Sequence, residues 1–146
     1  MKVVINCSYG GFGLSHKAIM EYSRIKNIKL YPYVYARNGK GFLDLDSYLR
    51  EASKNYYDYD VTVIHYSKRP VEDGIPDEGD QFYFSEHDII RDDPVLVEVV
   101  ERLGKDATKD FSELKIINVP DDVKWEIHSN QGREYILTLS KEEKSK

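Results

Sequence analysis

Residues 2–22, KVVINCSYGGFGLSHKAIMEY, constrain the fold more than any other stretch of the chain. The apolar run at 2–6 is typical of a strand that is covered on both faces, and it breaks into three glycines within four residues. Ser15 can cap a helix that follows, and the apolar face of this helix is expected at Leu14, Ala18, Tyr22 and Ile25. We therefore expect a central strand, a tight glycine loop and a helix.

The middle of the chain predicts further strands. Residues 28–36 alternate like a strand, but Pro32 cannot donate a ladder hydrogen bond, so this strand is expected at a sheet edge or with a bulge. The β-branched run VTVIHYS at 61–67 predicts another strand. Three less regular stretches are a short helix or irregular segment at 44–54, an exposed acidic loop at 68–80 and a short strand at 81–85.

The clearest helix lies in RDDPVLVEVVERLGKDA, residues 91–107. Asp93 before Pro94 marks its start, and Gly104 marks its end. Its wide apolar face is expected at Val95, Leu96, Val99, Val100 and Leu103. Downstream, residues 114–119 predict a strand, and the alternation on either side of SNQG predicts a β-hairpin.

These elements indicate the α+β class with an α/β-like start. We expect a single compact domain over residues 1–146, with a mixed β-sheet, two main helices, a C-terminal β-hairpin and a flexible tail at 141–146. The order of the strands is left open. A chain of 146 residues can bury a stable core without disulfides or a structural metal. Its one cysteine, Cys7, is expected to be a small buried side chain.

Charge and hydropathy narrow the class of partner. A net charge of −5 and a pI near 5.4 argue against duplex nucleic acid, which requires a broad basic surface. No N-terminal apolar stretch approaches the ~20 residues of a membrane span or has the layout of a signal peptide. We therefore expect a cytoplasmic protein with no membrane partner. A homo-oligomer stays an open alternative.

The stretch YGGFGLS at 9–15 is the strongest candidate for a ligand site. A glycine loop between a buried strand and a helix can aim backbone N–H groups and the positive end of the helix dipole at one anion. The stretch is neither GxGxxG nor GxxxxGK[ST], and a tight corner with Phe12 in the core is the alternative. The candidate ligand-binding residues of this loop are Tyr9, Gly10, Gly11, Phe12, Gly13, Leu14 and Ser15.

Three further residues are candidate ligand contacts by type. His65 and Tyr66 end a predicted strand, and ligands of open α/β sheets lie beyond such strand ends. Arg91 could hold a carboxylate or phosphate through a two-pronged contact. Alternatively, His87, Asp88 and Arg91 form a capping and salt-bridge cluster that leads into the helix at 94.

No catalytic motif stands out in the sequence. There is no G-x-S-x-G elbow, no H-E-x-x-H, no pair of HxT/S motifs and no cysteine near a predicted base. A metal site built from His87, Asp88 and Asp92 lacks an established ligand spacing, so neither a metal nor a cofactor is predicted. Whether the protein is an enzyme stays open, and binding is favoured over turnover.

Three blocks, VVIN…YGGFGLS, RDDPVLVEVVERLG and LKIINVPDDVKWEI, are spread over nearly the whole chain. As a set they resemble a family of small, mostly uncharacterised proteins of bacteriophages, prophages and bacteria. The resemblance implies a phage-encoded accessory protein that acts in the host cytoplasm, and it implies little about chemistry.

We therefore expect a protein that binds, without turnover, a small anionic nucleotide-derived ligand and so sequesters a signalling nucleotide of host antiviral defence. Its phosphates would lie on the glycine loop, and its bases would stack on tyrosine or Phe12. One alternative is a small nucleotide phosphoesterase or nucleotide-modifying enzyme that uses His65 or His87 as general acid or base. The other is an inhibitor that covers a host protein with a tyrosine-rich surface.

Overall fold

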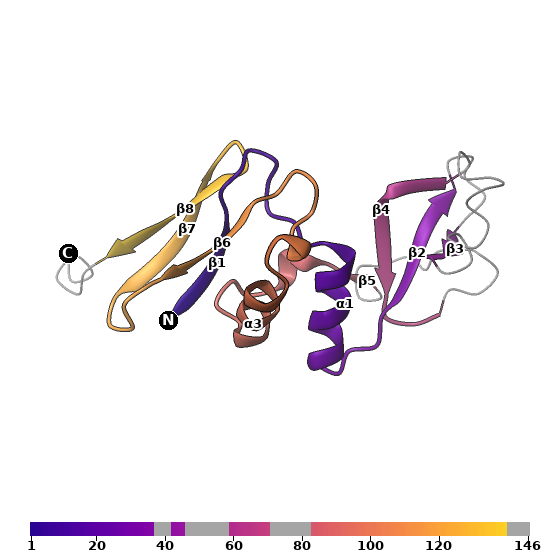
Figure 1. The fold of residues 1–146 in the computed structure, drawn as a ribbon, viewed down its shortest axis with the longest axis horizontal. Coiled ribbons are helices and arrows are strands. Elements are labelled where there is room, and N and C mark those ends of the chain that lie inside the picture. Colours follow the sequence, from indigo (N-terminus) through magenta and orange to yellow (C-terminus); the bar gives the residue numbers. More distant parts are fainter. Residues whose placement is uncertain (37–41, 46–58, 71–82, 140–146) are drawn as a thin grey trace. The chain divides into compact units, whose positions relative to one another are not determined.

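The computed structural model describes residues 1–36, 42–45, 59–70 and 83–139, and the chain divides into two compact units (Figure 1). Unit 1 comprises Met1–Lys26 and Glu86–Lys146, and unit 2 comprises Asn27–Ser85. The predicted α+β class, with two main helices and a C-terminal β-hairpin among the described residues, is confirmed. That the chain forms one domain stays a prediction, and the predicted tail at 141–146 lies outside the described residues.

Two antiparallel pairs of strands form the β part of unit 1. β1 (Lys2–Asn6) pairs with β6 (Leu114–Asn118), and β7 (Lys124–Asn130) pairs with β8 (Arg133–Leu139). The turn between β7 and β8 has positive φ at Gln131 (54°) and Gly132 (90°), as a two-residue type I′ turn requires. The hairpin predicted at SNQG is therefore confirmed.

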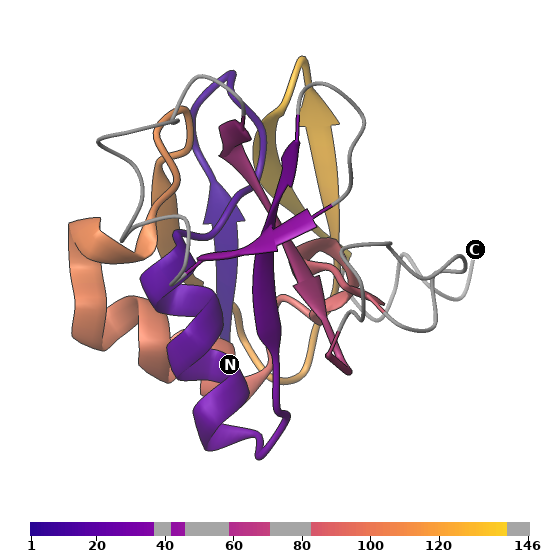
Figure 2. The same cartoon turned by 90° about the vertical axis from the view of Figure 1, so that its right-hand side faces the viewer.

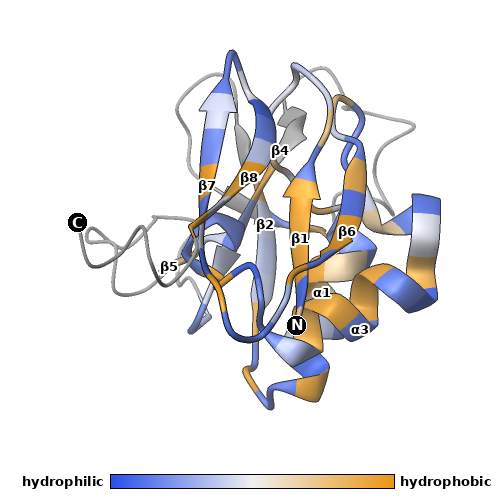
Figure 3. Cartoon of the chain, turned by 90° about the vertical axis from the view of Figure 1, so that its left-hand side faces the viewer, coloured by the Kyte–Doolittle hydropathy of each residue, from blue (hydrophilic) through white to orange (hydrophobic). Residues whose placement is uncertain are grey.

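The apolar side chains of β1 form one of the cores of unit 1. Val3 and Ile5 pack with Val119, and partly buried side chains of the hairpin, Trp125, Ile127 and Ile136, cover this cluster. Figure 3 shows β1 as a hydrophobic strand between the helices and the hairpin. Residues 3–6 of the strand are thus buried, as the apolar run Val3–Ile5 predicts.

The position of β1 in its sheet differs from the prediction. The strand is not central, because β6 is its one strand partner among the described residues. On the other edge, the Val4 N–H donates to the Arg91 carbonyl at 2.9 Å, and the Asn6 N–H donates to the Glu134 carboxylate at 2.8 Å. A loop carbonyl and a side chain satisfy the donors that a second strand would otherwise satisfy.

Two helices of unit 1, α1 (His16–Ile25) and α3 (Pro94–Leu103), lie side by side (Figure 2). Their predicted starts are confirmed, because Ser15 Oγ accepts from the Ala18 N–H at 3.1 Å and Asp93 Oδ1 accepts from the Val95 N–H at 2.8 Å. α3 buries Leu96, Val97, Val99 and Val100. Within the described residues, no helix is long and apolar enough to cross a membrane.

The Asp93 cap also joins the two helices. Its Oδ2 accepts a hydrogen bond from the Tyr22 hydroxyl at 2.7 Å and lies 3.0 Å from Lys26 Nζ. Burial alone would raise the pKa of the Asp93 carboxyl, but the hydrogen bonds from Tyr22, Lys26 and the Val95 N–H outweigh burial and hold this pKa below its ordinary value.

This arrangement predicts a loss of stability in acid. A depressed carboxyl pKa contributes stability that is present above the unfolded-state pKa and is lost as the pH falls through the folded-state pKa. From neutral pH to about pH 2, we expect the wild type to lose about 1 kcal/mol more free energy of unfolding than Asp93→Asn, which keeps the cap without the charge. Urea unfolding at both pH values measures the difference, and equal losses would contradict the prediction.

Unit 2 contains a four-stranded antiparallel sheet in the order β3-β2-β4-β5. Its strands are β3 (Phe42–Asp44), β2 (Tyr31–Ala36), β4 (Tyr59–Ser67) and β5 (Tyr83–Phe84). β2 carries the predicted irregularity as a register shift between Val34 and Tyr35. Pro32 lies opposite Tyr66 of β4, and β3 pairs only from Tyr33 onward, so the proline faces one strand.

The two irregular stretches predicted in this part of the chain cannot be compared in full. Most of the predicted segment at 44–54 and most of the predicted loop at 68–80 lie outside the described residues. The short strand predicted at 81–85 is present as β5, over two residues.

Candidate ligand-binding site

The glycine loop, residues 7–15, connects β1 to α1 and packs against the chain between Ala107 and Glu113. A Cβ on Gly10 would lie 1.8 Å from the Phe111 carbonyl oxygen, and a Cβ on Gly13 would lie 3.2 Å from the Lys109 side chain. Gly11 has φ +85°, a conformation that favours glycine. Part of the reason for the glycines is therefore close packing of the chain on itself, as the tight-corner alternative predicts.

Asn6, which is fully buried at the end of β1, holds this loop in place. Its Nδ2 donates to the carbonyls of Ser8 at 2.7 Å and Gly132 at 2.9 Å, and its Oδ1 accepts from the Glu113 N–H at 2.8 Å. Sequence reasoning missed this residue. The sequence did hold a signal: Asn6 is a polar side chain at the end of a strand that is covered on both faces. A buried amide requires hydrogen-bond partners, so such a residue is expected to join neighbouring segments.

A cavity of about 330 Å³ lies beside the loop in unit 1. The residues that line it are Gly10, Gly11, Phe12, Gly13, Glu86, His87, Lys109, Phe111 and Ser112. The predicted ligand loop thus contributes Gly10–Gly13 to this lining, and the side formed by Lys109, Phe111 and Ser112 was not predicted. We call it the loop cavity.

Four successive N–H groups of this loop have no hydrogen-bond acceptor among the described residues. The N–H groups of Gly10, Gly11, Phe12 and Gly13 donate no hydrogen bond to another described residue, and Phe12 and Gly13 are buried. Buried backbone N–H groups in proteins are nearly always paired, with protein, water or ligand. Two of the four donors belong to buried residues, and a run of N–H groups without an acceptor in the described protein is suited to the oxygens of an anion.

Two charged side chains of opposite sign line the loop cavity. Lys109 is exposed and forms no ion pair with another described residue. Glu86 is half-buried, and its carboxylate accepts a hydrogen bond from the Leu14 N–H. The His87 ring packs edge-on against Phe12, with 6.1 Å between the ring centroids. The cavity thus combines a lysine that forms no ion pair with a described residue and a carboxylate that accepts a hydrogen bond from the backbone.

Two exposed aromatic rings lie on the same loops. The Phe111 side chain is 80% exposed and the Tyr9 side chain is 64% exposed, which is unusual for large rings. The Arg133 guanidinium lies 5.9 Å from the centroid of the Tyr9 ring. Exposed rings beside cations are the side-chain types that stack on nucleotide bases.

Arg91 is engaged within the protein. Its guanidinium donates to both carboxylate oxygens of Glu134, at 2.6 and 2.8 Å, and lies 3.5 Å from the centroid of the Phe12 ring. Both members of the pair are largely buried, with 16% and 10% of the side chains exposed. The ion pair in the structure joins Arg91 to Glu134, a partner that the predicted His87–Asp88–Arg91 cluster did not include, and direct contact of Arg91 with a ligand stays a prediction.

The other predicted contacts occupy different places. Ser15 is the cap of α1 and Leu14 is a core side chain, 2% exposed. His65 and Tyr66 lie on β4 in unit 2, opposite Tyr33 and Pro32, whereas the glycine loop belongs to unit 1. Their role at a ligand site stays a prediction.

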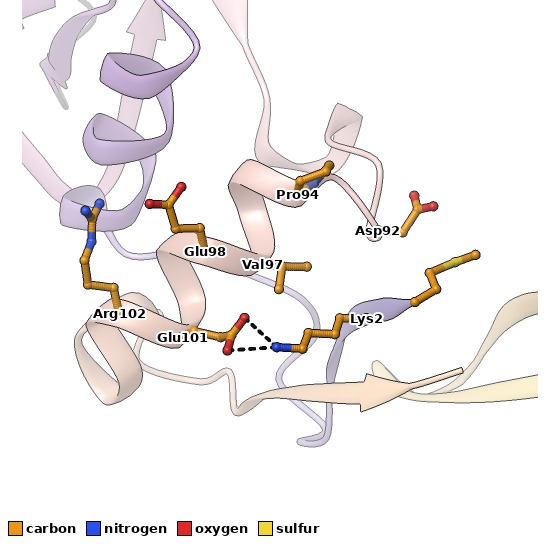
Figure 4. Close-up of a pocket in the computed structure, with 8 residues that line it drawn as sticks. Lys2, Asp92, Pro94, Val97, Glu98, Glu101 and Arg102 are labelled. Atoms are coloured by element: carbon orange, nitrogen blue, oxygen red, sulfur yellow. Dashed lines mark hydrogen bonds and ion pairs between the residues drawn. The ribbon is translucent and has the colours of Figure 1, made fainter. Parts of the chain in front are cut away.

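A second and larger cavity in unit 1, of about 640 Å³, lies between the start of β1 and α3 (Figure 4). Its acidic lining residues are Asp92, Glu98 and Glu101, and both of its basic residues have carboxylate partners. Lys2 Nζ lies 3.2 Å from Glu101, and Arg102 pairs with Glu21 of α1. This cavity is less suited to an anion than the loop cavity, although it is larger.

No group of three or more metal-ligating side chains that could hold an ion occurs among the described residues, which include His87, Asp88 and Asp92. Comparison of the chain with known protein families, curated proteins and solved structures finds no match. The resemblance to the phage and bacterial family therefore stays a prediction.

Proposed function

We propose that unit 1 binds a small anionic, nucleotide-like ligand at the loop cavity and does not turn it over. The observation that carries this proposal is the run of N–H groups at Gly10–Gly13 with no acceptor among the described residues. Such a run can surround phosphate oxygens in the way that other backbone anion sites do, whatever the net charge of the protein.

The side chains around the loop fit the two chemical parts of a nucleotide. Lys109 supplies a cation for the phosphate, and Ser112 fixes the loop by donating to the Gly11 carbonyl at 2.7 Å. Phe111 and Tyr9 offer exposed ring faces for a base. A cavity of about 330 Å³ is within the range of small-molecule sites.

The biological part of the proposal rests on the sequence resemblance. A phage-type accessory protein that acts in the host cytoplasm would sequester a nucleotide signal of antiviral defence by this binding. Duplex nucleic acid is not a partner in this proposal, because the net charge is −5.

The stacking part of the proposal predicts a specific loss of affinity. Phe111→Ala should weaken nucleotide binding by about 1–3 kcal/mol, because one base–aromatic stack is removed from an exposed site with little effect on the core. Tyr135→Ala, a ring that is 47% exposed on β8, is the matched control and should leave affinity unchanged. Calorimetry with adenine nucleotides measures both. Equal affinities of wild type and Phe111→Ala would contradict stacking on this ring.

Turnover is tested separately by recovery of the nucleotide. The wild type is incubated with a cyclic nucleotide and with ADP-ribose, denatured, and the released small molecules are separated by chromatography. The proposal predicts that the intact nucleotide is returned in proportion to the protein. Multiple turnovers that disappear in His87→Gln would instead establish an enzyme, because a general acid or base is needed for rate far more than for affinity.

A further inference from the structure

Glu86 places a negative charge on the wall of the loop cavity. Its carboxylate accepts from the N–H of Leu14, the residue that follows the four unpaired N–H groups. Leu14 is 2% exposed, and its N–H donates to Glu86 rather than to solvent. Among the described residues, no cation forms an ion pair with Glu86. Glu86 thus lines the cavity with a carboxylate whose charge no described cation neutralises.

The position of this carboxylate is fixed by the backbone around it. Glu86 begins a 3₁₀ turn, Glu86–Asp88, and its carbonyl accepts from the Ile89 N–H at 3.2 Å. Ile89 is buried, which anchors the turn. Glu86 would therefore keep its position when an anion binds, unless the hydrogen bond to Leu14 is broken.

We infer that Glu86 makes the loop cavity selective for phosphodiesters over phosphate monoesters. This inference rests on the proposed function. A monoester carries close to two negative charges at neutral pH, whereas a diester carries one. Lys109 can balance one charge at the cavity, and the second charge of a monoester would be repelled by Glu86. The ligand class is then a nucleotide with a single phosphodiester, as in a cyclic mononucleotide.

The test compares two probes that differ by one charge: adenosine 5′-monophosphate and its 5′-O-methyl phosphodiester. Binding to the full-length protein is measured by calorimetry at pH 8 and low salt, where imidazoles are neutral and screening is weak. We expect the wild type to bind the methyl ester about tenfold more tightly, because Glu86 repels the second charge of the monoester. Partial solvation of the site limits the difference to about this size. In Glu86→Gln, which keeps an acceptor for Leu14, the ratio should fall to about one, mainly through tighter binding of the monoester.

Glu113→Gln is the matched control, because it also replaces a glutamate by glutamine but at an exposed residue outside the cavity lining. It should keep the wild-type ratio of the two affinities. Equal binding of the two probes by the wild type would overturn the inference and leave the proposed function standing. A preference that persists in Glu86→Gln would also overturn it. If neither probe binds to the wild type or to Glu86→Gln, the proposed function fails, and this inference fails with it.

Discussion

Arg91→Met is expected to lower the free energy of unfolding by about 3–5 kcal/mol, because it leaves the Glu134 carboxylate buried without its cation. The change also removes the donor to the Val4 carbonyl and the guanidinium that stacks on Phe12. Urea unfolding at neutral pH measures the loss. The effect is large because the hydrogen bond from the Asn6 N–H keeps the Glu134 carboxylate at the buried edge of β1.

A double variant isolates the charge from the packing. Arg91→Met combined with Glu134→Gln removes both charges and keeps an acceptor for Asn6, so it should recover most of the loss. Arg102→Met is the surface control: its partner is Glu21, its side chain is 46% exposed, and its loss should stay below about 1 kcal/mol. A loss of the same size in Arg91→Met and Arg102→Met would show that the buried pair does not stabilise unit 1.

Asn6→Leu is expected to lower the free energy of unfolding by about 3 kcal/mol or more. The leucine is similar in size, but it leaves the carbonyls of Ser8 and Gly132 and the N–H of Glu113 without their partner in a partly buried place. Each such group costs about 1–3 kcal/mol. Because Asn6 joins the glycine loop to the hairpin turn, nucleotide affinity should fall as well.

Asn6→Asp separates the two halves of this amide. Aspartate keeps the acceptor for Glu113 but replaces the donor with an oxygen that faces two carbonyls, so it should be at least as destabilising as leucine. Asn118→Leu, at an exposed position on β6, is the control and should change stability by less than about 0.5 kcal/mol. A tolerated Asn6→Asp would contradict the assigned orientation of the amide.

The local features of the fold could be predicted because their causes lie within a few residues. The Ser15 cap contacts Ala18, the Asp93 cap contacts Val95, and the turn after Asn130 requires a residue such as Gly132. Capping and positive φ are decided by neighbouring residues, so the sequence pattern states them directly.

The far side of the site could not be predicted because it depends on strand pairing. Asn6 lies opposite Leu114 in the antiparallel pair β1 and β6, and this register brings Lys109 and Phe111 beside the glycine loop. The order of the strands was open from the sequence, so these contacts were not visible. The same holds for Glu134, which follows Arg91 by 43 residues and forms the ion pair that the sequence left unassigned.

The amide resonances of the glycine loop give the most direct test of ligand binding at this site. In a ¹⁵N-labelled sample titrated with the methyl phosphodiester of adenosine monophosphate, we expect the N–H signals of Gly10, Gly11, Phe12 and Gly13 to shift downfield and saturate together. Hydrogen bonds to phosphate oxygens produce such shifts, and the phosphorus signal of the nucleotide should stay that of the intact diester. Saturation of binding with these four signals unmoved would contradict the proposed site.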